Sequence, residues 1–165
     1  MTHSIRLPRP FSLPAHLIPA SLHATFITQI FNQLLSEQRQ QGELDFLQDR
    51  VLCINIEDAA ISFSISLQNK RLVAAKSKHY DMKISGTIHD FLLLSSRTED
   101  ADTLFFQRRL KMQGDTELGL YLKNFLDGMD IDTLPYYNRM NPLLIKGIRV
   151  YEQLFQKTAP GYQPA

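Results

Sequence analysis

The sequence lacks the residues that several kinds of functional site require. It contains one cysteine, Cys53, which excludes an intrachain disulfide and leaves no thiolate cluster for zinc or an iron–sulfur centre. Its 18 lysines and arginines nearly balance 17 aspartates and glutamates, so a net charge of +1 provides no global field that would attract nucleic acid. None of the seven glycines falls in a G-x-G-x-x-G or G-x-x-x-x-G-K array, the loops that hold phosphates. These absences argue against nucleotide, nucleic-acid and metal–thiolate chemistry.

Catalytic and metal-binding patterns are missing as well. The five histidines show neither H-E-x-x-H nor spaced Cys/His pairs. We interpret His89 as a residue in the first turn of a helix, and Cys53 as an inert thiol, because its neighbours carry no positive charge. The spacing of Asp127, Asp130 and Asp132 departs from the calcium loop D-x-[DN]-x-[DN]-G. The sequence therefore predicts no catalytic residue, no metal and no enzymatic activity.

What is present is the composition of one globular domain. The chain has 165 residues, of which 44% are apolar and 21% charged, enough to bury a hydrophobic core of its own. Four prolines interrupt residues 1–19, so we expect a Pro-rich arm there and no signal peptide. The predicted location is cytoplasmic, with peripheral attachment to the inner membrane left open.

An amphipathic helix is expected from Ala20 to Gln41. Apolar residues recur there at i, i+4 spacing: Leu22, Phe26, Ile30 and Leu34. Gly42 stands where a helix end favours a left-handed backbone. The apolar stripe fits either a helix that covers the core or an element that lies on a membrane.

After Gly42 the hydrophobic period changes from 3.6 to 2, which indicates strands. The expected strands are Leu44–Leu47, Val51–Ile56, Ala60–Leu67, Leu72–Ala75, Tyr80–Ser85 and Arg109–Gln113. Because the first connections are too short for a parallel crossover, we expect neighbouring strands to run antiparallel. The fold class is therefore α+β, with an antiparallel sheet of five to six strands covered by helices.

The second half of the chain supplies those helices. Thr87 and Asp100 are expected to cap two of them, and Asp115 precedes a third that extends to Asp127. Pro135 and Pro142 fit the first position of helices, so the last helix is predicted from Pro142 to Gln156. This last helix carries an apolar stripe, and residues 133–157 have a local charge of +3. It can cover the core or bind anionic lipid, and in the second case its membrane contacts would be Leu144, Ile148, Arg149, Tyr151 and Phe155.

A resemblance to a known family rests on the run DADTLFFQRRLKMQGDTELGLYLKNFLDGMD, from Asp100 to Asp130, and on the strands before it. This region resembles the sterol-carrier-protein type 2 domain. Residues 42–130 are similar, more closely, to the UbiT family of bacterial ubiquinone-biosynthesis accessory factors. The resemblance implies a hydrophobic tunnel that holds an isoprenoid quinone or its precursor during oxygen-independent ubiquinone synthesis. It also implies no cofactor beyond the bound lipid, and the UbiU–UbiV iron–sulfur hydroxylase pair as partner enzymes.

On this reading the chain divides into a Pro-rich arm (1–19), a lipid-binding domain (20–132) and a C-terminal helical segment (133–165). The predicted lipid-binding residues are apolar and lie on one face of their elements: Phe63, Ile65, Met82, Ile84, Phe91, Phe106, Leu118, Leu122, Phe125 and Leu126.

A lipid tail of about 40 carbons needs roughly 1,200 Å³ at about 30 Å³ per carbon, which is more than the volume of a usual pocket. Part of the tail must then protrude, or two subunits must share it as a homodimer. A general phospholipid or fatty-acyl carrier, or an assembly adaptor with a filled core, would show the same apolar pattern.

Overall fold

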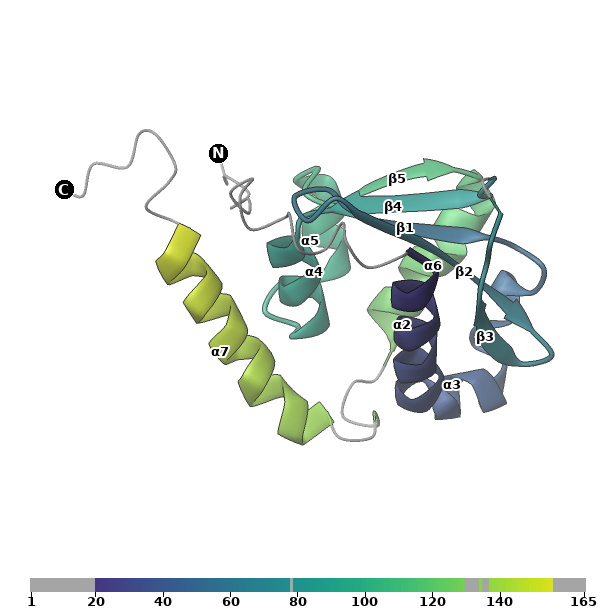
Figure 1. Cartoon of the computed structure of the whole chain (residues 1–165), viewed down its shortest axis with the longest axis horizontal. Helices are drawn as coiled ribbons and strands as arrows, with labels where there is room; N and C mark the ends of the chain where they lie inside the picture. Colours follow the sequence, from purple (N-terminus) through teal and green to yellow (C-terminus); the bar gives the residue numbers. More distant parts are fainter. Residues whose placement is uncertain (1–19, 78, 130–133, 135–136, 156–165) are drawn as a thin grey trace.

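The computed structural model of the chain describes residues 20–77, 79–129, 134 and 137–155. It contains a five-stranded sheet and helices that cover one of its faces (Figure 1). The strands are β1 (Leu52–Ile56), β2 (Ile61–Gln68), β3 (Arg71–Ala74), β4 (Met82–Gly86) and β5 (Lys111–Gly114). The helices are α2 (Ala20–Leu34), α3 (Ser36–Gln41), the 3₁₀ turn η2 (Asp45–Leu47), α4 (Ile88–Ser95), α5 (Ala101–Phe106), α6 (Thr116–Gly128) and α7 (Tyr137–Phe155). This arrangement confirms the α+β class.

The alternation of β2 explains which face of the sheet becomes the core. Phe63, Ile65 and Leu67 are buried on this strand, whereas Ser62 is exposed. Because successive strand side chains point to opposite faces, the apolar set lies together under the helices. In Figure 1, α2, α4 and α6 all lie on that side of the sheet.

The sheet is mixed, which corrects the prediction that it is antiparallel throughout. Its order is β3-β2-β1-β4-β5, and β4 pairs with β1 in parallel. The register places Ala74, at the end of β3, level with Met82, at the start of β4. Residues 75–81 therefore have only to cross three strand spacings, roughly 14 Å, and seven extended residues can span roughly 23 Å. A short connection thus reaches the far side of β1 without a hairpin.

The predicted first strand, residues 44–47, is also wrong. Its backbone N–H groups bond locally, from Leu47 to the Leu44 carbonyl at 2.9 Å and from Gln48 to the Asp45 carbonyl at 3.0 Å. Leu44 and Leu47 are both 2% exposed, three residues apart. That spacing places both side chains on the same side of a 3₁₀ turn, whereas in a strand they would point to opposite faces.

The helix ends follow the sequence signals in most places. Thr87 and Asp90 form a capping box at the start of α4, and Asp100 and Asp115 cap α5 and α6. Gly42 has φ 80° and ends α3, although the expected helix over 20–41 is interrupted at Leu35. These caps confirm the predicted starts of α4, α5 and α6.

The last helix starts earlier than predicted. Helix α7 begins at Tyr137, and Pro142 lies inside it, so this proline gives up one backbone hydrogen bond. Pro135 lies outside the described residues. The helix packs against α4, at the side of the domain (Figure 1). Among the described residues, none of the helices combines the length and apolar character that crossing a bilayer requires.

Candidate lipid-binding site

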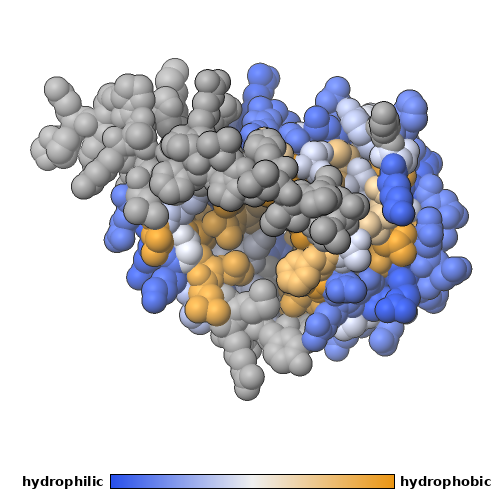
Figure 2. Space-filling model, viewed as in Figure 1, coloured by the Kyte–Doolittle hydropathy of each residue, from blue (hydrophilic) through white to orange (hydrophobic). Residues whose placement is uncertain are grey.

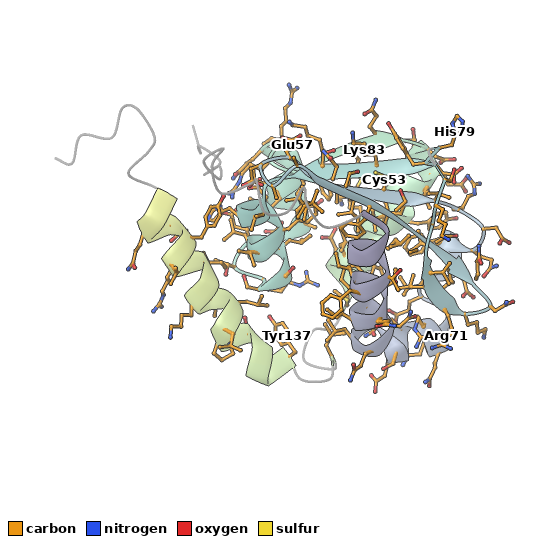
Figure 3. All side chains as sticks on the ribbon, in the orientation of Figure 1. Cys53, Glu57, Arg71, His79, Lys83 and Tyr137 are labelled. Atoms are coloured by element: carbon orange, nitrogen blue, oxygen red, sulfur yellow. The ribbon has the colours of Figure 1, made fainter. Side chains whose placement is uncertain are left out.

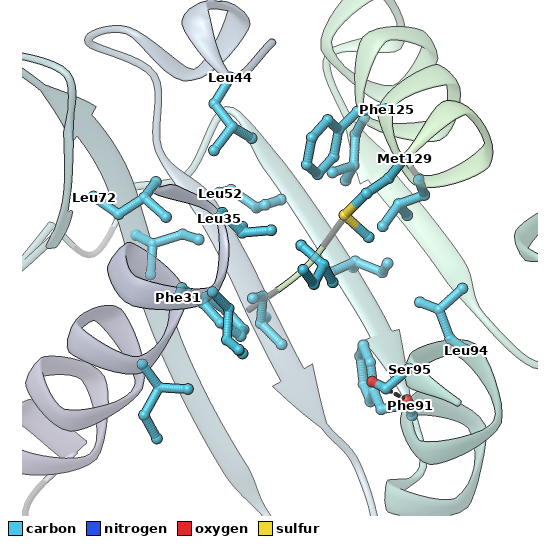
Figure 4. Close-up of a pocket in the computed structure, with 18 of the residues that line it drawn as sticks. Phe31, Leu35, Leu44, Leu52, Leu72, Phe91, Leu94, Ser95, Phe125 and Met129 are labelled. Atoms are coloured by element: carbon cyan, nitrogen blue, oxygen red, sulfur yellow. Dashed lines mark hydrogen bonds between the residues drawn. The ribbon is translucent and has the colours of Figure 1, made fainter. Parts of the chain in front are cut away.

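A cavity of about 400 Å³ lies between the apolar face of the sheet and the helices. Its floor comes from β1 to β4, and its walls come from α2, α4 and α6 (Figure 4). The start of α7 adds Tyr137 and Leu144 to the lining. The lining is almost wholly aliphatic and aromatic, with Phe31, Phe91 and Phe125 from three different helices. Its size falls within the range of small-molecule pockets, and its apolar wall suits a hydrocarbon chain.

The cavity is partly open to solvent. Figure 2 shows apolar side chains gathered around a hollow on the face where α2 and α7 lie. Large apolar side chains are exposed on these helices, among them Phe26 at 64% and Leu143 at 68%. A chain longer than the cavity would therefore leave it across an apolar surface.

Six of the predicted lipid-binding residues line this cavity: Ile65, Ile84, Phe91, Leu122, Phe125 and Leu126. Phe63, Met82 and Leu118 are buried in the hydrophobic core outside the lining. Sequence periodicity places a residue on the core face, but it does not distinguish a packed position from one beside empty space.

Phe106 is placed elsewhere, with 91% of its surface exposed. The short helix α5 turns Ala101 and Leu104 inward, both fully buried. Phe105 is half-buried, and the next residue lies about 100° further round the helix. Adjacent phenylalanines on a helix cannot both face the core, so Phe106 does not line the cavity.

The prediction missed the contribution of α2 and of the turn after α3. Ile30, Phe31 and Leu34 line the cavity from α2, and Leu44 and Leu47 line it from the turn. The i, i+4 stripe of the first helix was the available signal, but it does not coincide with the buried face: Phe26 and Ile30 are 64% and 38% exposed, and the buried residues among the described ones of α2 are Ala24 and Thr28. Only the tertiary arrangement shows that the C-terminal half of α2, with Ile30, Phe31 and Leu34, faces the cavity.

The apolar side of α7 is directed at the protein itself. Leu144 lines the cavity, while Ile148 and Tyr151 are buried at 5% and 7% exposure. Of the predicted membrane contacts, Arg149 is exposed, and the side chain of Phe155 lies outside the described residues. The positions of Leu144, Ile148 and Tyr151 therefore agree with the interpretation that the last helix covers the core, and not with the one in which these side chains contact a membrane.

A buried polar network fixes α7 to α4. The His89 ring stacks on Tyr151 with centroids 5.7 Å apart, and its Nε2 lies 3.1 Å from Glu152 Oε1. Arg109 Nη2 is 3.3 Å from His89 Nδ1. Because arginine can only donate, Nδ1 is the acceptor of this contact, and Nε2 is the ring nitrogen that faces Glu152. The Tyr151 hydroxyl donates to Asp58 Oδ2 at 2.7 Å.

The centre of this network is the ion pair of Asp90 and Arg109. Asp90 is fully buried, and Arg109 Nε donates to its Oδ1 at 2.7 Å. Arg109 Nη1 also donates to both carboxylate oxygens of Glu99 at 2.9 Å. Burial, followed by the hydrogen bond to Asp58, raises the pKa of Tyr151 well above its usual value, so this phenol stays protonated. The network lies outside the cavity lining, and it holds the elements that enclose the cavity.

The polar members of the cavity wall are few. Ser95, Arg97 and Tyr137 are the polar residues among the described ones that line it. Figure 3 shows Tyr137 projecting from the first turn of α7 toward the rest of the protein.

Within the described ranges, no cluster of three or more His, Cys, Asp or Glu side chains could hold a metal ion. Cys53 is buried, and its Sγ lies 3.4 Å from Ser62 Oγ, away from the cavity.

Comparison with known proteins agrees with this geometry. Residues 28–127 match the model of the SCP-2 sterol transfer family. The chain is 35% identical over 153 residues to the ubiquinone biosynthesis accessory factor UbiT of Escherichia coli (strain K12), covering 93% of this chain and 86% of that protein. A UbiT of Escherichia coli O157:H7 matches to the same extent.

Among solved structures, the UbiJ-SCP2 ubiquinone synthesis protein superposes with a TM-score of 0.52 at 16% identity, covering 64% of this chain and 94% of that one. These matches confirm the resemblance that the run from Asp100 to Asp130 carries. The chain belongs to the SCP-2 sterol transfer family.

Proposed function

We propose that the protein is a non-catalytic carrier that binds an isoprenoid quinone, or a biosynthetic precursor of one, and presents it to enzymes of oxygen-independent ubiquinone synthesis. The observation that carries this proposal is the apolar cavity of about 400 Å³ in a chain similar to UbiT. The partner enzymes would include an iron–sulfur hydroxylase pair of the UbiU–UbiV kind, which would perform the chemistry.

The volume of the cavity sets how much of the ligand it holds. At about 30 Å³ per carbon, 400 Å³ accommodates roughly 13 carbons, or two to three isoprene units. Each five-carbon unit contributes on the order of 4 kcal/mol of burial before the cost of ordering the ligand. Two or three buried units therefore suffice for micromolar affinity. The rest of a long tail would leave by the open side, past Phe26 and Ile30.

The outer face of α7 supports contact with a membrane while the inner face packs on the domain. Leu143 and Val150 are 68% and 44% exposed, and Lys146 and Arg149 are exposed beside them. Apolar side chains flanked by cations suit the headgroup region of anionic lipid. Such a surface would let the carrier collect a lipid from the bilayer and return it there.

A general fatty-acyl or phospholipid carrier is the second candidate, because roughly 13 carbons also match most of one acyl chain. The cavity argues against the third alternative, an adaptor with a filled core. Competition between the two ligand classes separates the two remaining candidates.

The test is a titration of the delipidated full-length chain with ubiquinones that carry one, two, three and four isoprene units. The affinity should rise steeply up to two or three units and then level off, with a Kd in the micromolar range. A C16 fatty acid should compete less well than the three-unit quinone. Absence of saturable quinone binding, with normal fatty-acid binding, would assign the protein to the second class of carrier.

A further inference from the structure

One aromatic side chain projects into solvent from the turn between α5 and β5. Phe106, the last residue of α5, is 91% exposed, more than any other large apolar side chain among the described residues. Its place in the chain is nevertheless fixed, because Leu104 and Leu110 on either side of it are fully buried. The ring is therefore held in solvent by a well-anchored segment.

Backbone hydrogen bonds fix the shape of this turn. The Arg109 N–H bonds to the Leu104 carbonyl and the Arg108 N–H to the Phe105 carbonyl, both at 3.0 Å, which is the Schellman arrangement at a helix end. Arg108 occupies the left-handed position of the motif, with φ 58°, where glycine is the unstrained choice. The side chain of Arg109 is held in the buried polar network. We call residues 106–108 the α5 knuckle.

The α5 knuckle carries a positive charge that the protein does not neutralise. Arg108 is exposed, and within the described ranges no acceptor contacts its guanidinium. The acidic side chains of the adjoining elements are paired: Asp102 of α5 lies 2.5 Å from Lys123 Nζ, and Glu57 lies 3.3 Å from Lys111 Nζ of β5. The knuckle therefore presents one apolar ring beside one unpaired cation.

The α5 knuckle lies on the same side of the domain as α7. Helix α4 packs against both α5 and α7 (Figure 1). The turn is also joined to α7 through the buried network, since Arg109 Nη2 lies 3.3 Å from His89 Nδ1 and His89 Nε2 lies 3.1 Å from Glu152 Oε1. The knuckle is thus fixed to the helix whose outer face combines exposed apolar and basic side chains.

Resting on the proposed carrier function, we propose that the α5 knuckle is a second membrane contact. The Phe106 ring inserts at the boundary between headgroups and acyl chains of an anionic bilayer, and Arg108 binds the lipid phosphates. Phe105 and Met112 are half-buried, so the exposed apolar area at the turn is that of one ring. A stable protein partner needs a matching surface of about 800 Å². A bilayer accepts a single ring without one.

The experiment uses tryptophan fluorescence, because the chain contains no tryptophan. Phe106→Trp protein, full-length, is mixed with vesicles of phosphatidylglycerol and phosphatidylcholine in equal parts. Its emission should shift to shorter wavelength and be quenched by lipids brominated on their acyl chains. Vesicles of phosphatidylcholine alone should give a smaller response, because the charge attraction is then absent.

Tyr80→Trp is the matched control. Tyr80 is also an exposed aromatic residue beside a cation, with Lys83 Nζ 6.0 Å from its ring centroid. It precedes the start of β4, whereas Ser85 near the end of β4 pairs with Lys111, which follows the knuckle. The control thus lies at the other end of this strand, and its emission should respond neither to vesicles nor to brominated lipid.

Two further variants measure the contribution of the α5 knuckle to binding. Phe106→Ala should weaken binding to the anionic vesicles about tenfold, about 1.4 kcal/mol, in a flotation assay. Arg108→Gln should weaken binding to anionic vesicles and leave binding to neutral ones unchanged. Because Phe106 and Arg108 lie outside the cavity lining, neither variant should change the affinity for three-unit ubiquinone in solution.

The outcomes separate the membrane contact from the carrier function. Emission of the Phe106→Trp protein that stays unchanged overturns the proposal, whether or not the protein floats with the vesicles. An equal response of the Tyr80→Trp protein also overturns it, because the effect is then not specific to the knuckle. A shift that appears without vesicles as the protein concentration rises assigns the ring to a second copy of the chain instead. Failure of wild-type protein to bind quinone overturns the carrier function, whereas the emission experiment contains no quinone.

Discussion

A larger side chain at Leu126 distinguishes a ligand cavity from an ordinary core. Leu126 is half-buried on α6 and lines the cavity. In a close-packed core the change Leu126→Trp would cost about 1–3 kcal/mol of unfolding free energy. In the cavity the indole has room, so the unfolding free energy of the delipidated protein should stay the same or rise. If the ring displaces about three methylenes of ligand, at about 0.8 kcal/mol each, the affinity should fall by about 2.4 kcal/mol, close to sixtyfold.

The assay combines chemical unfolding of delipidated protein with a titration of three-unit ubiquinone for each variant. Leu120→Trp is the matched control, because Leu120 lies on the same helix with 57% of its surface exposed and outside the cavity lining. This control should alter neither quantity. A Leu126→Trp variant that is destabilised and binds quinone normally would refute the reasoning, since the position would then belong to the packed core.

Three further predictions concern the elements that enclose the cavity and the outer surface of α7. Tyr151→Phe removes the hydrogen bond to Asp58 that helps hold α7, and should lower the free energy of unfolding by about 1 kcal/mol in a denaturant titration. Asp115 has a lowered pKa, chiefly because its carboxylate accepts a backbone N–H in the first turn of α6, so its contribution to stability is complete above the unfolded pKa and disappears as the pH falls through the folded pKa. Asp115→Asn should therefore flatten the acid side of a plot of melting temperature against pH, and an unchanged plot would contradict the role of the charge. Replacing Lys146 and Arg149 together by glutamate should reduce flotation with anionic liposomes and leave flotation with neutral liposomes unchanged, whereas equal flotation of both proteins would exclude an electrostatic contribution.

The sequence predicted those features of the fold that depend only on residues close together in the chain, namely helix caps and the alternation of side chains along a strand. Thr87 and Asp115 cap helices because their side chains reach backbone N–H groups three residues away. The alternation of Phe63, Ile65 and Leu67 follows from the pleat of a strand. These features need no knowledge of distant residues.

The parts that the sequence could not supply depend on distant partners. The parallel pairing of β1 with β4 follows from where residues 75–81 cross the sheet, and no local pattern records that crossing. The network of His89, Arg109 and Glu152 joins residues up to 63 positions apart, and each of the three looks like an ordinary surface residue in the sequence.

The candidate site shows the same division. Periodicity identified the apolar face of α6, including Leu122 and Leu126. It also placed Met82 on the apolar face of β4, but it could not show that Met82 lies in the packed core and not in the cavity wall. Arg97 escaped notice because one arginine between Ser96 and Thr98 carries no pattern. Its place in the cavity wall follows from the tertiary fold alone.

The most direct test of the central claim is to identify what occupies the cavity in the cell. The full-length protein would be expressed in a ubiquinone-producing bacterium under oxygen limitation and purified without detergent. An organic extract of the protein would then be analysed by mass spectrometry. Leu126→Trp protein prepared in parallel serves as the control for lipid bound outside the cavity. The account predicts an isoprenoid quinone or a prenylated precursor in near-stoichiometric amount with wild-type protein and a marked reduction with the variant. Repeated preparations free of lipid, which also fail to bind added quinone, would contradict it.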